Sequence, residues 1–241
     1  MTELPTVCIL AGGLGTRLGH RVRDTPKPLI EIAGEPFLLH QLRLLAFHGV
    51  SDVVLCVGYL GDAIERRIGH ERFGLRIVYS FDAPELDGTL GAIIRARSLL
   101  GERFLVIYGD TYLRIDYGAA ADGWCQSGLP AMMTVLRNNG RWDASNVVYA
   151  SGRVLAYDKK TPRPEMHWID YGLGGLEQGA LDLAPVGISD LADLYHQLAQ
   201  DGSLYGFEAY ERFYEIGSPE GLADTEAFVC RIKSPSQPDA C

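Results

Sequence analysis

The residues best suited to chemistry lie near the N-terminus, where a glycine-rich loop is followed by cationic side chains. The apolar run Val7–Ala11 has the composition of a buried strand, and Gly12-Gly13-Leu14-Gly15 follows it directly. A glycine loop at the end of a strand lets backbone N–H groups approach a phosphate closely. Arg17 and Lys27 then supply positive charge. The segment predicts a phosphate-binding site.

Two familiar glycine loops do not fit this segment. A dinucleotide fingerprint beginning at Gly13 needs a glycine at position 18, where Leu18 stands. A Walker A loop needs Gly-Lys-Ser or Gly-Lys-Thr, whereas Gly15 is followed by Thr16 and Arg17. The plain alternative is a tight turn between a strand and a helix, but turn chemistry alone does not explain the arginine and the lysine.

A carboxylate stands at the end of another apolar run. Phe104–Tyr108 has the composition of a strand, and Gly109 and Asp110 come directly after it. Ligands of open α/β sheets bind at the carboxyl ends of the parallel strands, so Asp110 is placed where a ligand would lie. The plain alternative is that Asp110 caps the start of a helix.

The elements that must position these residues can be read from the first 110 residues, which alternate short apolar runs with amphipathic stretches. This alternation implies βαβ crossovers and a parallel sheet. The expected strands are Val7–Ala11, Val53–Val57, Ile77–Ser80 and Phe104–Tyr108. The expected helices are Pro36–His48, whose inner face includes Gln41 among apolar residues, Gly61–Ile68 and Gly91–Leu100.

The second half is more mixed. Its expected strands are Ala131–Leu136, Val147–Tyr149 and Val154–Tyr157, the last two joined by a hairpin turn at Ser151-Gly152. Its expected helices are Asp190–Asp201 and Pro219–Arg231. We therefore expect one three-layer α/β domain over residues 1–233, with a mostly parallel, Rossmann-like sheet, an inserted β-rich part and a flexible tail at 234–241.

Composition narrows the class of partner. The chain has 241 residues and a net charge of −9, which disfavours nucleic acid because a polyanion needs a basic face. No run approaches 18 apolar residues, and the first residues lack the pattern of a signal peptide, so we expect no membrane partner and a cytoplasmic protein. The five cysteines form no Cys-x-x-Cys pair, which argues against a disulfide framework or structural zinc. A homo-oligomer stays open.

The segment Leu10-Ala11-Gly12-Gly13-Leu14-Gly15-Thr16-Arg17-Leu18, followed by Pro26-Lys27-Pro28, resembles the signature of sugar-phosphate nucleotidyltransferases. Within that family the chain is most similar to the short enzymes related to heptose 1-phosphate guanylyltransferases. The resemblance implies transfer of a nucleotidyl group from an NTP to a sugar 1-phosphate, a heptose or a hexose, with release of pyrophosphate.

The resemblance also implies a nucleotide site in residues 1–110. Leu86-Asp87-Gly88-Thr89 resembles the family loop that meets the base and ribose, and Arg17 and Lys27 take the catalytic positions. The residues implied for nucleotide binding are Leu10, Ala11, Gly12, Gly13, Gly15, Thr16, Asp82, Gly88, Thr89 and Gly109.

The remaining functions fall mostly in residues 111–233. By resemblance, Asp110 and Glu215 hold Mg²⁺, Glu215 either directly or through a water, and Lys159, with Lys160 as a competitor, meets the sugar phosphate. Glu215 also precedes Ser218-Pro219, the start of an expected helix with proline at its first position. The residues implied for sugar-phosphate binding are Asn146, Lys159, Asp170, Tyr171 and Gly172.

The choice of base follows from hydrogen-bonding capacity. The stretch before Gly88 contains Asp82 and Glu85 but no Asn or Gln. An ionised carboxylate only accepts hydrogen bonds, and it can take N1–H and N2–H of guanine together. GTP is therefore the favoured donor. Cytosine offers one such bond, and the plain alternative is that both acids are solvated loop residues.

Three other functions stay open. One is a cytidylyltransferase acting on a phosphocholine-like or phosphonate substrate, for which Trp142, Trp168 and Tyr171 would form an aromatic cage around the cationic group. Another is a uridylyl- or thymidylyltransferase of the same fold. The last is a nucleotide-sensing module without catalysis, which the presence of Arg17, Lys27 and Asp110 disfavours.

Overall fold

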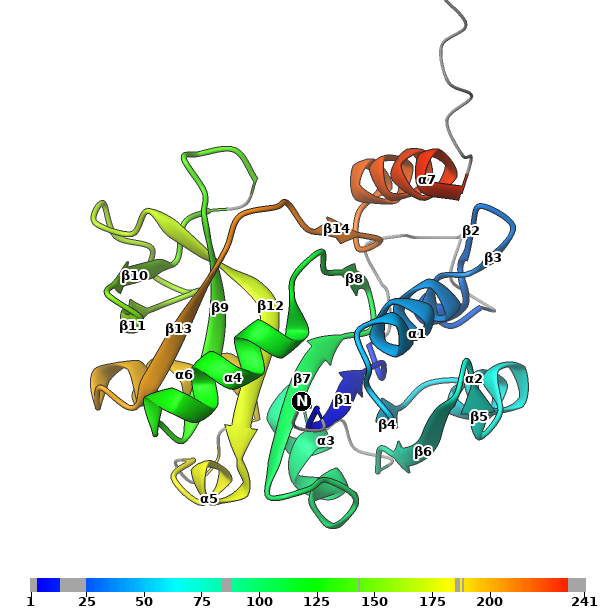
Figure 1. Cartoon of the computed structure of the whole chain (residues 1–241), viewed down its shortest axis with the longest axis horizontal. Coiled ribbons are helices and arrows are strands. Elements are labelled where there is room, and N and C mark those ends of the chain that lie inside the picture. The colour runs from blue at the N-terminus through cyan, green and yellow to red at the C-terminus, as the bar shows by residue number, and fades with distance from the viewer. Residues whose placement is uncertain are drawn as a thin grey trace, which may run out of the picture.

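A ten-stranded sheet forms the centre of the computed structural model, which describes residues 4–13, 25–83, 88–142, 144–184, 187 and 189–233 (Figure 1). From one edge to the other the strands are β10 (Val147–Ala150), β11 (Arg153–Tyr157), β13 (Leu204–Ala209), β9 (Ala131–Arg137), β12 (Trp168–Glu177), β7 (Arg103–Tyr108), β1 (Thr6–Leu10), β4 (Asp52–Val57), β6 (Leu75–Phe81) and β5 (Glu71–Arg72).

The half of the sheet built from the first 110 residues is parallel, as predicted, except that the edge strand β5 pairs antiparallel with β6. Strand β1 pairs in parallel with β4 and β7, and β4 pairs in parallel with β6. Val7, Cys8 and Ile9 of β1 are fully buried, as expected for a strand that is covered on both faces. The helices that follow the strands are α1 (Phe37–Phe47), α2 (Gly61–Ile68) and α3 (Gly88–Ala96), which a short 3₁₀ turn, η3 (Arg97–Leu99), extends.

The second half extends the same sheet. Strand β12 runs antiparallel to both β7 and β9, whereas β13 is parallel to β9. Strands β10 and β11 form the predicted hairpin, and positive φ angles of 50° at Ser151 and 76° at Gly152 make its turn. The α/β fold class is confirmed. The sheet as a whole is mixed, because β12 runs antiparallel to both of its neighbours and the edge strands β5, β10 and β11 also form antiparallel pairs.

Helices cover both faces of the sheet, so the predicted three layers are present (Figure 1). One buried cluster joins Val7 and Ile9 to α1, α2 and α4 (Tyr117–Ser127). The other joins Cys8 to α3, α5 (Gln178–Leu181) and α6 (Leu191–Gln200). Successive side chains of a strand point to opposite faces, which is why β1 contributes to both clusters.

A smaller core lies where the last helix, α7 (Pro219–Lys233), meets two short strand pairs. These pairs are β2 (Glu31–Ile32) with β3 (Glu35–Pro36), and β8 (Thr111–Tyr112) with β14 (Tyr214–Glu215). Ile32, Phe37 and Phe228 are buried there. The backbone N–H of Ala33 donates to Oε1 of Glu226 at 2.9 Å, which fastens α7 to the β2–β3 turn.

Two further observations concern the predictions from the sequence. The tail at 234–241 lies outside the residues that the structure describes. Among those that it does describe, no helix is both long and apolar enough to cross a membrane.

Candidate active site

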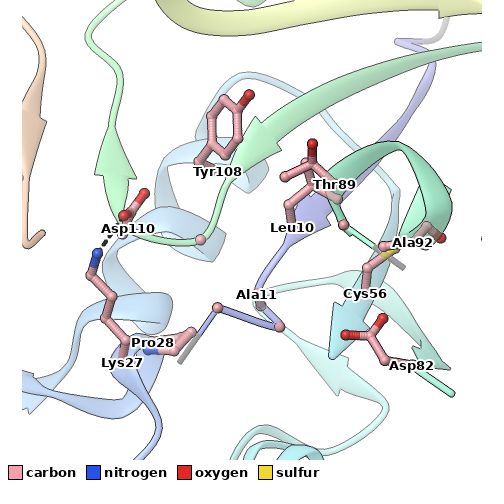
Figure 2. A pocket seen from close by; sticks show the side chains of 14 residues that line it. Leu10, Ala11, Lys27, Pro28, Cys56, Asp82, Thr89, Ala92, Tyr108 and Asp110 are labelled. Atoms are coloured by element: carbon pink, nitrogen blue, oxygen red, sulfur yellow. Dashed lines mark hydrogen bonds and ion pairs between the residues drawn. The ribbon is translucent and has the colours of Figure 1, made fainter. Parts of the chain in front are cut away.

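A cavity of about 410 Å³ opens at the carboxyl ends of β1, β4 and β7; we call it the first pocket (Figure 2). Parallel strands present ligands at this edge of a sheet. The described residues that line it are Leu10, Ala11, Gly12, Gly13, Lys27, Pro28, Cys56, Asp82, Gly88, Thr89, Ala92, Tyr108, Gly109 and Asp110. Every predicted nucleotide-binding residue that the structure describes is in this set.

Close backbone contacts form the floor of the first pocket. The N–H of Gly109 donates to the carbonyl of Leu10 at 2.8 Å, and the N–H of Ala11 donates to that of Cys56, also at 2.8 Å. A Cβ on Gly109 would stand only 3.0 Å from the Leu10 carbonyl oxygen and 3.1 Å from Cα of Ala11. A glycine at 109 therefore allows the ends of β1 and β7 to meet.

The Asp82 carboxylate packs between two glycines. The backbone N–H of Asp82 donates to the carbonyl of Val57 at 2.8 Å, which fixes Asp82 just beyond β6. Its Oδ2 lies 2.6 Å from the position of a Cβ on Gly12 and 2.5 Å from that of a Cβ on Gly58. Any side chain at either glycine would displace the carboxylate, so Gly58 belongs to this site although the sequence did not point to it.

The start of α3 is held by the start of α6. The Thr89 hydroxyl donates to Oδ1 of Asp190 at 3.1 Å and accepts from the N–H of Leu191 at 2.8 Å. Gly88 has a φ of +70°, and a Cβ there would stand 2.4 Å from the carbonyl oxygen of Ser189. Gly88 and Thr89 thus line the first pocket and also join the two halves of the chain.

Lys27 and Asp110, which both line the first pocket, form an ion pair. Nζ of Lys27 lies 2.5 Å from Oδ2 of Asp110 (Figure 2). Lys27 begins a short 3₁₀ turn, η2 (Lys27–Leu29), which Pro26 precedes and Pro28 stiffens. Asp110 follows β7, and its carbonyl accepts from the N–H of Ile216 at 2.9 Å.

A second pocket of about 750 Å³ shares Lys27, Tyr108 and Asp110 with the first. The described residues that line it are Lys27, Tyr108, Asp110, Thr111, Arg141, Trp142, Lys159, Arg212, Phe213, Glu215, Gly217, Ser218, Glu220, Gly221 and Asp224. The predicted metal residues Asp110 and Glu215 and the predicted lysine Lys159 therefore face one space.

The Glu215 carboxylate is fixed at the start of α7. Its Oε1 accepts from the Ser218 hydroxyl at 2.6 Å, and its Oε2 accepts from the backbone N–H of Gly217. Glu215 Oε2, Lys27 Nζ and Asp110 Oδ2 all lie within 3.6 Å of the point where a Cβ on Gly217 would stand. The absence of a side chain at 217 lets the three charges gather.

This donor set fits Mg²⁺. Two carboxylates near one point offer oxygen ligands, and magnesium in phosphate-binding sites is held by one or two carboxylates together with phosphate and water oxygens. No group of three or more His, Cys, Asp or Glu side chains suited to a metal occurs among the described residues. With two protein carboxylates, phosphate and water oxygens would supply the other ligands.

Lys159 and Lys160 point to different places. Nζ of Lys159 lies 3.9 Å from Oδ2 of Asp170, 5.7 Å from the ring centre of Tyr108 and 6.0 Å from that of Tyr157. Nζ of Lys160 pairs with Oδ1 of Asp193 on α6 at 2.6 Å. Of the two, Lys159 is the lysine that reaches the second pocket.

None of the other predicted sugar residues is among the described lining of either pocket. Oδ1 of Asn146 accepts from the Asp170 N–H at 3.1 Å, and Oδ1 of Asp170 accepts from the Gly172 N–H at 3.0 Å. Tyr171 is 1 % exposed, and its hydroxyl donates to the carbonyl of Arg114 at 3.2 Å. Tyr171 thus packs in the core.

Asp170 is nevertheless electrostatically connected to the site. Burial, followed by the Asp170 charge, raises the pKa of the Tyr157 hydroxyl well above its usual range. Tyr157 therefore stays protonated and donates to Oδ2 of Asp170 at 3.1 Å. The same carboxylate oxygen faces Lys159, so Asp170 helps to aim that lysine.

The aromatic cage considered for a cationic head group is not assembled. The Trp168 ring packs edge-on against Tyr149, with ring centres 4.9 Å apart, and Tyr171 is buried elsewhere. Trp142 does line the second pocket, but the guanidinium of Arg212 lies 4.3 Å from the centre of its ring. The protein's own cation already covers that aromatic face.

Comparison with known proteins agrees with this geometry. Residues 7–167, more than half of the chain, match the family model described as the MobA-like NTP transferase domain. The chain belongs to this family of nucleotidyltransferases.

Two relatives are named as sugar 1-phosphate nucleotidyltransferases. This family member is 31% identical over 222 residues to mannose-1-phosphate guanyltransferase beta-A of Xenopus laevis, covering 88% of this chain and 61% of the relative. It is 30% identical over 228 residues to glucose-1-phosphate cytidylyltransferase of Salmonella typhimurium, covering 83% of this chain and 86% of the relative. The predicted sugar-phosphate nucleotidyltransferase family is confirmed.

Solved structures show the same fold. The structure of HddC from Yersinia pseudotuberculosis complexed with GMP-PN matches 94% of this nucleotidyltransferase-family chain and 100% of that chain, with a TM-score of 0.75 and 25% identity. A putative glucose-1-phosphate thymidylyltransferase from Bacillus anthracis matches with a TM-score of 0.83, covering 96% and 98% of the two chains, at 19% identity, which speaks for the fold alone.

Some residues of the site were predicted and others were not. Gly15, Thr16, Arg17 and Glu85 lie outside the described residues, so their predicted roles stay predictions. Sequence reasoning missed the pocket residues Tyr108, Cys56, Arg141, Arg212 and Gly217. Tyr108 had a usable signal because it directly precedes Gly109 and Asp110.

Proposed function

We propose that this chain transfers a nucleotidyl group from an NTP to a sugar 1-phosphate, a heptose or a hexose, giving an NDP-sugar and pyrophosphate. One observation carries the proposal: the first and second pockets meet at the Lys27–Asp110 pair. The first pocket suits the nucleotide, and the second suits the acceptor. Their shared wall is then the place of reaction.

The chemistry needs no strong base. A phosphate oxygen of the sugar 1-phosphate attacks the α-phosphorus of the NTP, and the bond from that phosphorus to the pyrophosphate oxygen breaks. The nucleophile is already an anion, so the barrier lies in bringing anions together and in charge on the phosphoryl oxygens. Catalysis is then positioning plus electrostatic stabilisation.

Two lysines and an arginine supply the positive charge in this proposal. Lys27, at the shared wall, contacts the α-phosphate and the incoming phosphate. Lys159, held between Asp170 and two aromatic rings, anchors the sugar phosphate. Arg17, which the sequence places beside the glycine loop, holds the pyrophosphate portion.

Mg²⁺ is the proposed cofactor, with Asp110 and Glu215 as its protein ligands. A bound magnesium ion would neutralise charge on the α-phosphate and act as a template for the phosphates. The support is the nearness of the two carboxylates at Gly217 and the oxygen-only chemistry of the pair.

GTP is the proposed donor. The Asp82 carboxylate lines the first pocket and can accept both N1–H and N2–H of guanine. A relative named mannose-1-phosphate guanyltransferase and a neighbour complexed with GMP-PN add support. CTP is the second candidate, because another relative is named glucose-1-phosphate cytidylyltransferase. UTP and dTTP rank below both, since a carboxylate faces the carbonyls of their bases unfavourably.

The two substrates divide the chain in this proposal. Residues 1–110 bind the nucleotide, and residues 111–233 bind the sugar, within a single domain over residues 1–233. The contacts of Thr89 with Asp190 and Leu191 hold the two halves together beside the first pocket. The chain spans 61% of the length of its guanyltransferase relative from Xenopus laevis, so this division concerns the shared part.

A pyrophosphate-release screen tests the function. Sugar 1-phosphates are combined with each of the four NTPs, with phosphocholine as a further acceptor and the Lys27→Ala variant as a control. We expect release that depends on a sugar 1-phosphate and is lost in the variant. Pyrophosphate release with phosphocholine and with none of the sugar 1-phosphates would show that the acceptor is a phosphocholine-like compound. Nucleotide binding without release in any combination would favour the sensing module.

A further inference from the structure

Gln41 is a buried amide that lies among leucines on the inner face of α1. Its side chain is 2 % exposed, and Leu38, Leu42 and Leu45 around it on the helix are fully buried. A polar group in such a place needs hydrogen-bond partners, because an unpaired buried amide is costly. Its partners therefore indicate what the amide does.

The amide bridges the turn that carries Asp110. Nε2 of Gln41 donates to the carbonyl of Tyr108 at 2.9 Å and to the carbonyl of Thr111 at 2.6 Å. These carbonyls stand on either side of Gly109 and Asp110. Both partners only accept, so the NH₂ end of the amide must point at them. One side chain thus spans the turn from its first residue to its last.

The other end of the amide strengthens the inference. Oε1 of Gln41 is buried, and no partner for it is found within the described part of the chain. Leucine, which is similar in size, would avoid that unpaired acceptor, so the packing of α1 gives no reason for an amide here. What only the amide supplies is the pair of hydrogen bonds to the turn.

We propose that Gln41 is a positioning residue: it fixes the turn at 108–111 and so sets the Asp110 carboxylate against Nζ of Lys27. The proposal rests on the proposed function, in which that carboxylate and that lysine act on the phosphates. In the Gln41→Leu variant the Thr111 carbonyl loses the Gln41 donor, and the Tyr108 carbonyl keeps only the Thr111 hydroxyl at 3.1 Å, so the turn relaxes and the Asp110 carboxylate moves. Shifts of about 1 Å at a reacting centre can cost about 10²-fold in rate.

The same chain offers a matched control at the opposite end of β7. Nε2 of Gln178 donates to the carbonyls of Leu100 at 2.8 Å, Gly101 at 3.2 Å and Arg97 at 3.3 Å, just before the strand begins. Gln178 thus spans a turn with the same chemistry, away from both pockets. Gln178→Leu should cost stability as Gln41→Leu does, without the effect on turnover.

The experiment compares steady-state kinetics and thermal unfolding of both leucine variants. We expect Gln41→Leu to lower kcat at least tenfold, with the KM for the NTP changed much less, while Gln178→Leu keeps kcat within about threefold of wild type. If the two variants lose similar amounts of melting temperature but only Gln41→Leu loses kcat, the loss of kcat comes from positioning and not from general destabilisation. Equal kcat values for the two variants would overturn the proposal.

Gln41→Glu adds a readout that a structural role would not move. A protonated carboxyl can still donate one hydrogen bond to the carbonyls, whereas a carboxylate donates none and faces them with its lone pairs. The ratio of kcat in the Gln41→Glu variant to kcat in wild type should therefore rise as the pH falls. A ratio independent of pH would contradict the assignment.

A crystal structure of the Gln41→Leu variant separates this proposal from the proposed function. We expect a displaced Asp110 carboxylate and a Lys27–Asp110 contact longer than 2.5 Å. If the turn and the Lys27–Asp110 contact are unchanged in the Gln41→Leu variant, the positioning role is overturned, whatever the activity of the variant. If the wild type transfers no nucleotide to any sugar 1-phosphate, the proposed function fails, and the position of the carboxylate still decides the role of Gln41.

Discussion

Nζ of Lys27 lies 2.5 Å from Oδ2 of Asp110, although 83 positions separate the two residues in the chain. The lysine comes from a 3₁₀ turn after the glycine loop, and the aspartate comes from the end of β7. The lysine side chain is 14% exposed and the aspartate side chain 33%, so the pair is only partly open to solvent. A cation held there against a carboxylate is in place before any phosphate arrives, which is the preorganisation that electrostatic catalysis needs.

Lys27→Ala should lower kcat by roughly 10²-fold or more while the fold stays intact, because the lysine acts on charge that develops during transfer. Arg17→Ala is expected to do the same, on the strength of its place in the sequence. Pyrophosphate release by the purified variants measures the effect, with circular dichroism as the check on folding. Lys160→Ala is the matched control, since Lys160 pairs with Asp193 outside the pockets. Turnover like that of wild type in a folded Lys27→Ala enzyme would rule out the role of the lysine.

Activity should require a divalent cation and disappear with EDTA. Asp110→Asn should damage turnover more than Glu215→Gln, because it removes the negative charge that holds Nζ of Lys27 as well as a metal ligand, whereas the Glu215 carboxylate accepts from Gly217 and Ser218. Glu215→Gln should in addition lower the melting temperature, since this carboxylate accepts from Gly217 and Ser218 at the start of α7. Full activity in metal-free buffer would refute the metal assignment, and so would an active Asp110→Asn variant.

The fold was predictable where one periodicity dominates a segment. Helix α2 covers Gly61–Ile68, the range predicted from its pattern. Strand β12 was missed because Gly172, Gly174 and Gly175 interrupt it, and glycine is a poor strand former. Helix α4 was missed because alanine and glycine weaken its pattern, although Asp116 caps its start and Gly128, with a φ of 66°, ends it.

The site was predictable where its residues are close in sequence. The glycine loop, Lys27 and Asp110 follow strands that can be recognised, so their meeting at one edge of the sheet could be foreseen. Gly58 makes its contacts with a distant segment, for which a single sequence carries no local signal. Gln41 stood out as an amide among apolar residues, but its partners at Tyr108 and Thr111 could not be foreseen. Asp170 and Tyr171 are neighbours on β12, and neighbours on a strand point to opposite faces, so Tyr171 turns toward the core while Asp170 turns toward Lys159.

Gly217→Ala should disrupt the gathered charges of the second pocket. A Cβ at 217 would stand 2.6 Å from Oε2 of Glu215 and 3.1 Å from Nζ of Lys27, so at least one of the two must move. We expect kcat to fall at least tenfold. Gly179→Ala is the control, because a Cβ at that position in α5 has no neighbour within 4 Å. Equal turnover of the two variants would show that these charges need not converge.

Glu35 should make stability depend on pH in the acid range. Hydrogen bonds from Arg43, and next from Lys233, lower the pKa of Glu35 from 4.5 to about 2. Because the folded-state pKa is depressed, the ionised carboxylate stabilises the fold above about pH 4.5, and this stabilisation is lost as the pH falls toward 2. The difference in melting temperature between wild type and Glu35→Gln should therefore shrink over that range. A difference that stays constant from pH 7 to pH 2 would contradict this.

The choice of base can be tested at Asp82, whose carboxylate packs between Gly12 and Gly58. In a competition assay with equimolar GTP, CTP, UTP and dTTP, we expect the GDP-sugar to dominate, because Asp82 can accept two N–H groups of guanine but only one amino group of cytosine. Asp82→Asn should reduce the preference for GTP by roughly tenfold or more, since loss of one charge-assisted hydrogen bond is worth about 1.5–3 kcal/mol. Gly58→Ala should act in the same direction with the carboxylate intact, because its Cβ would stand 2.5 Å from Oδ2 of Asp82 and push that side chain out of place. Asp62→Asn, on the polar face of α2, is the control for a lost negative charge and should leave the preference unchanged. Dominant UDP- or dTDP-sugar formation by the wild type would show that Asp82 does not read guanine, and so would an Asp82→Asn variant with the preference of wild type.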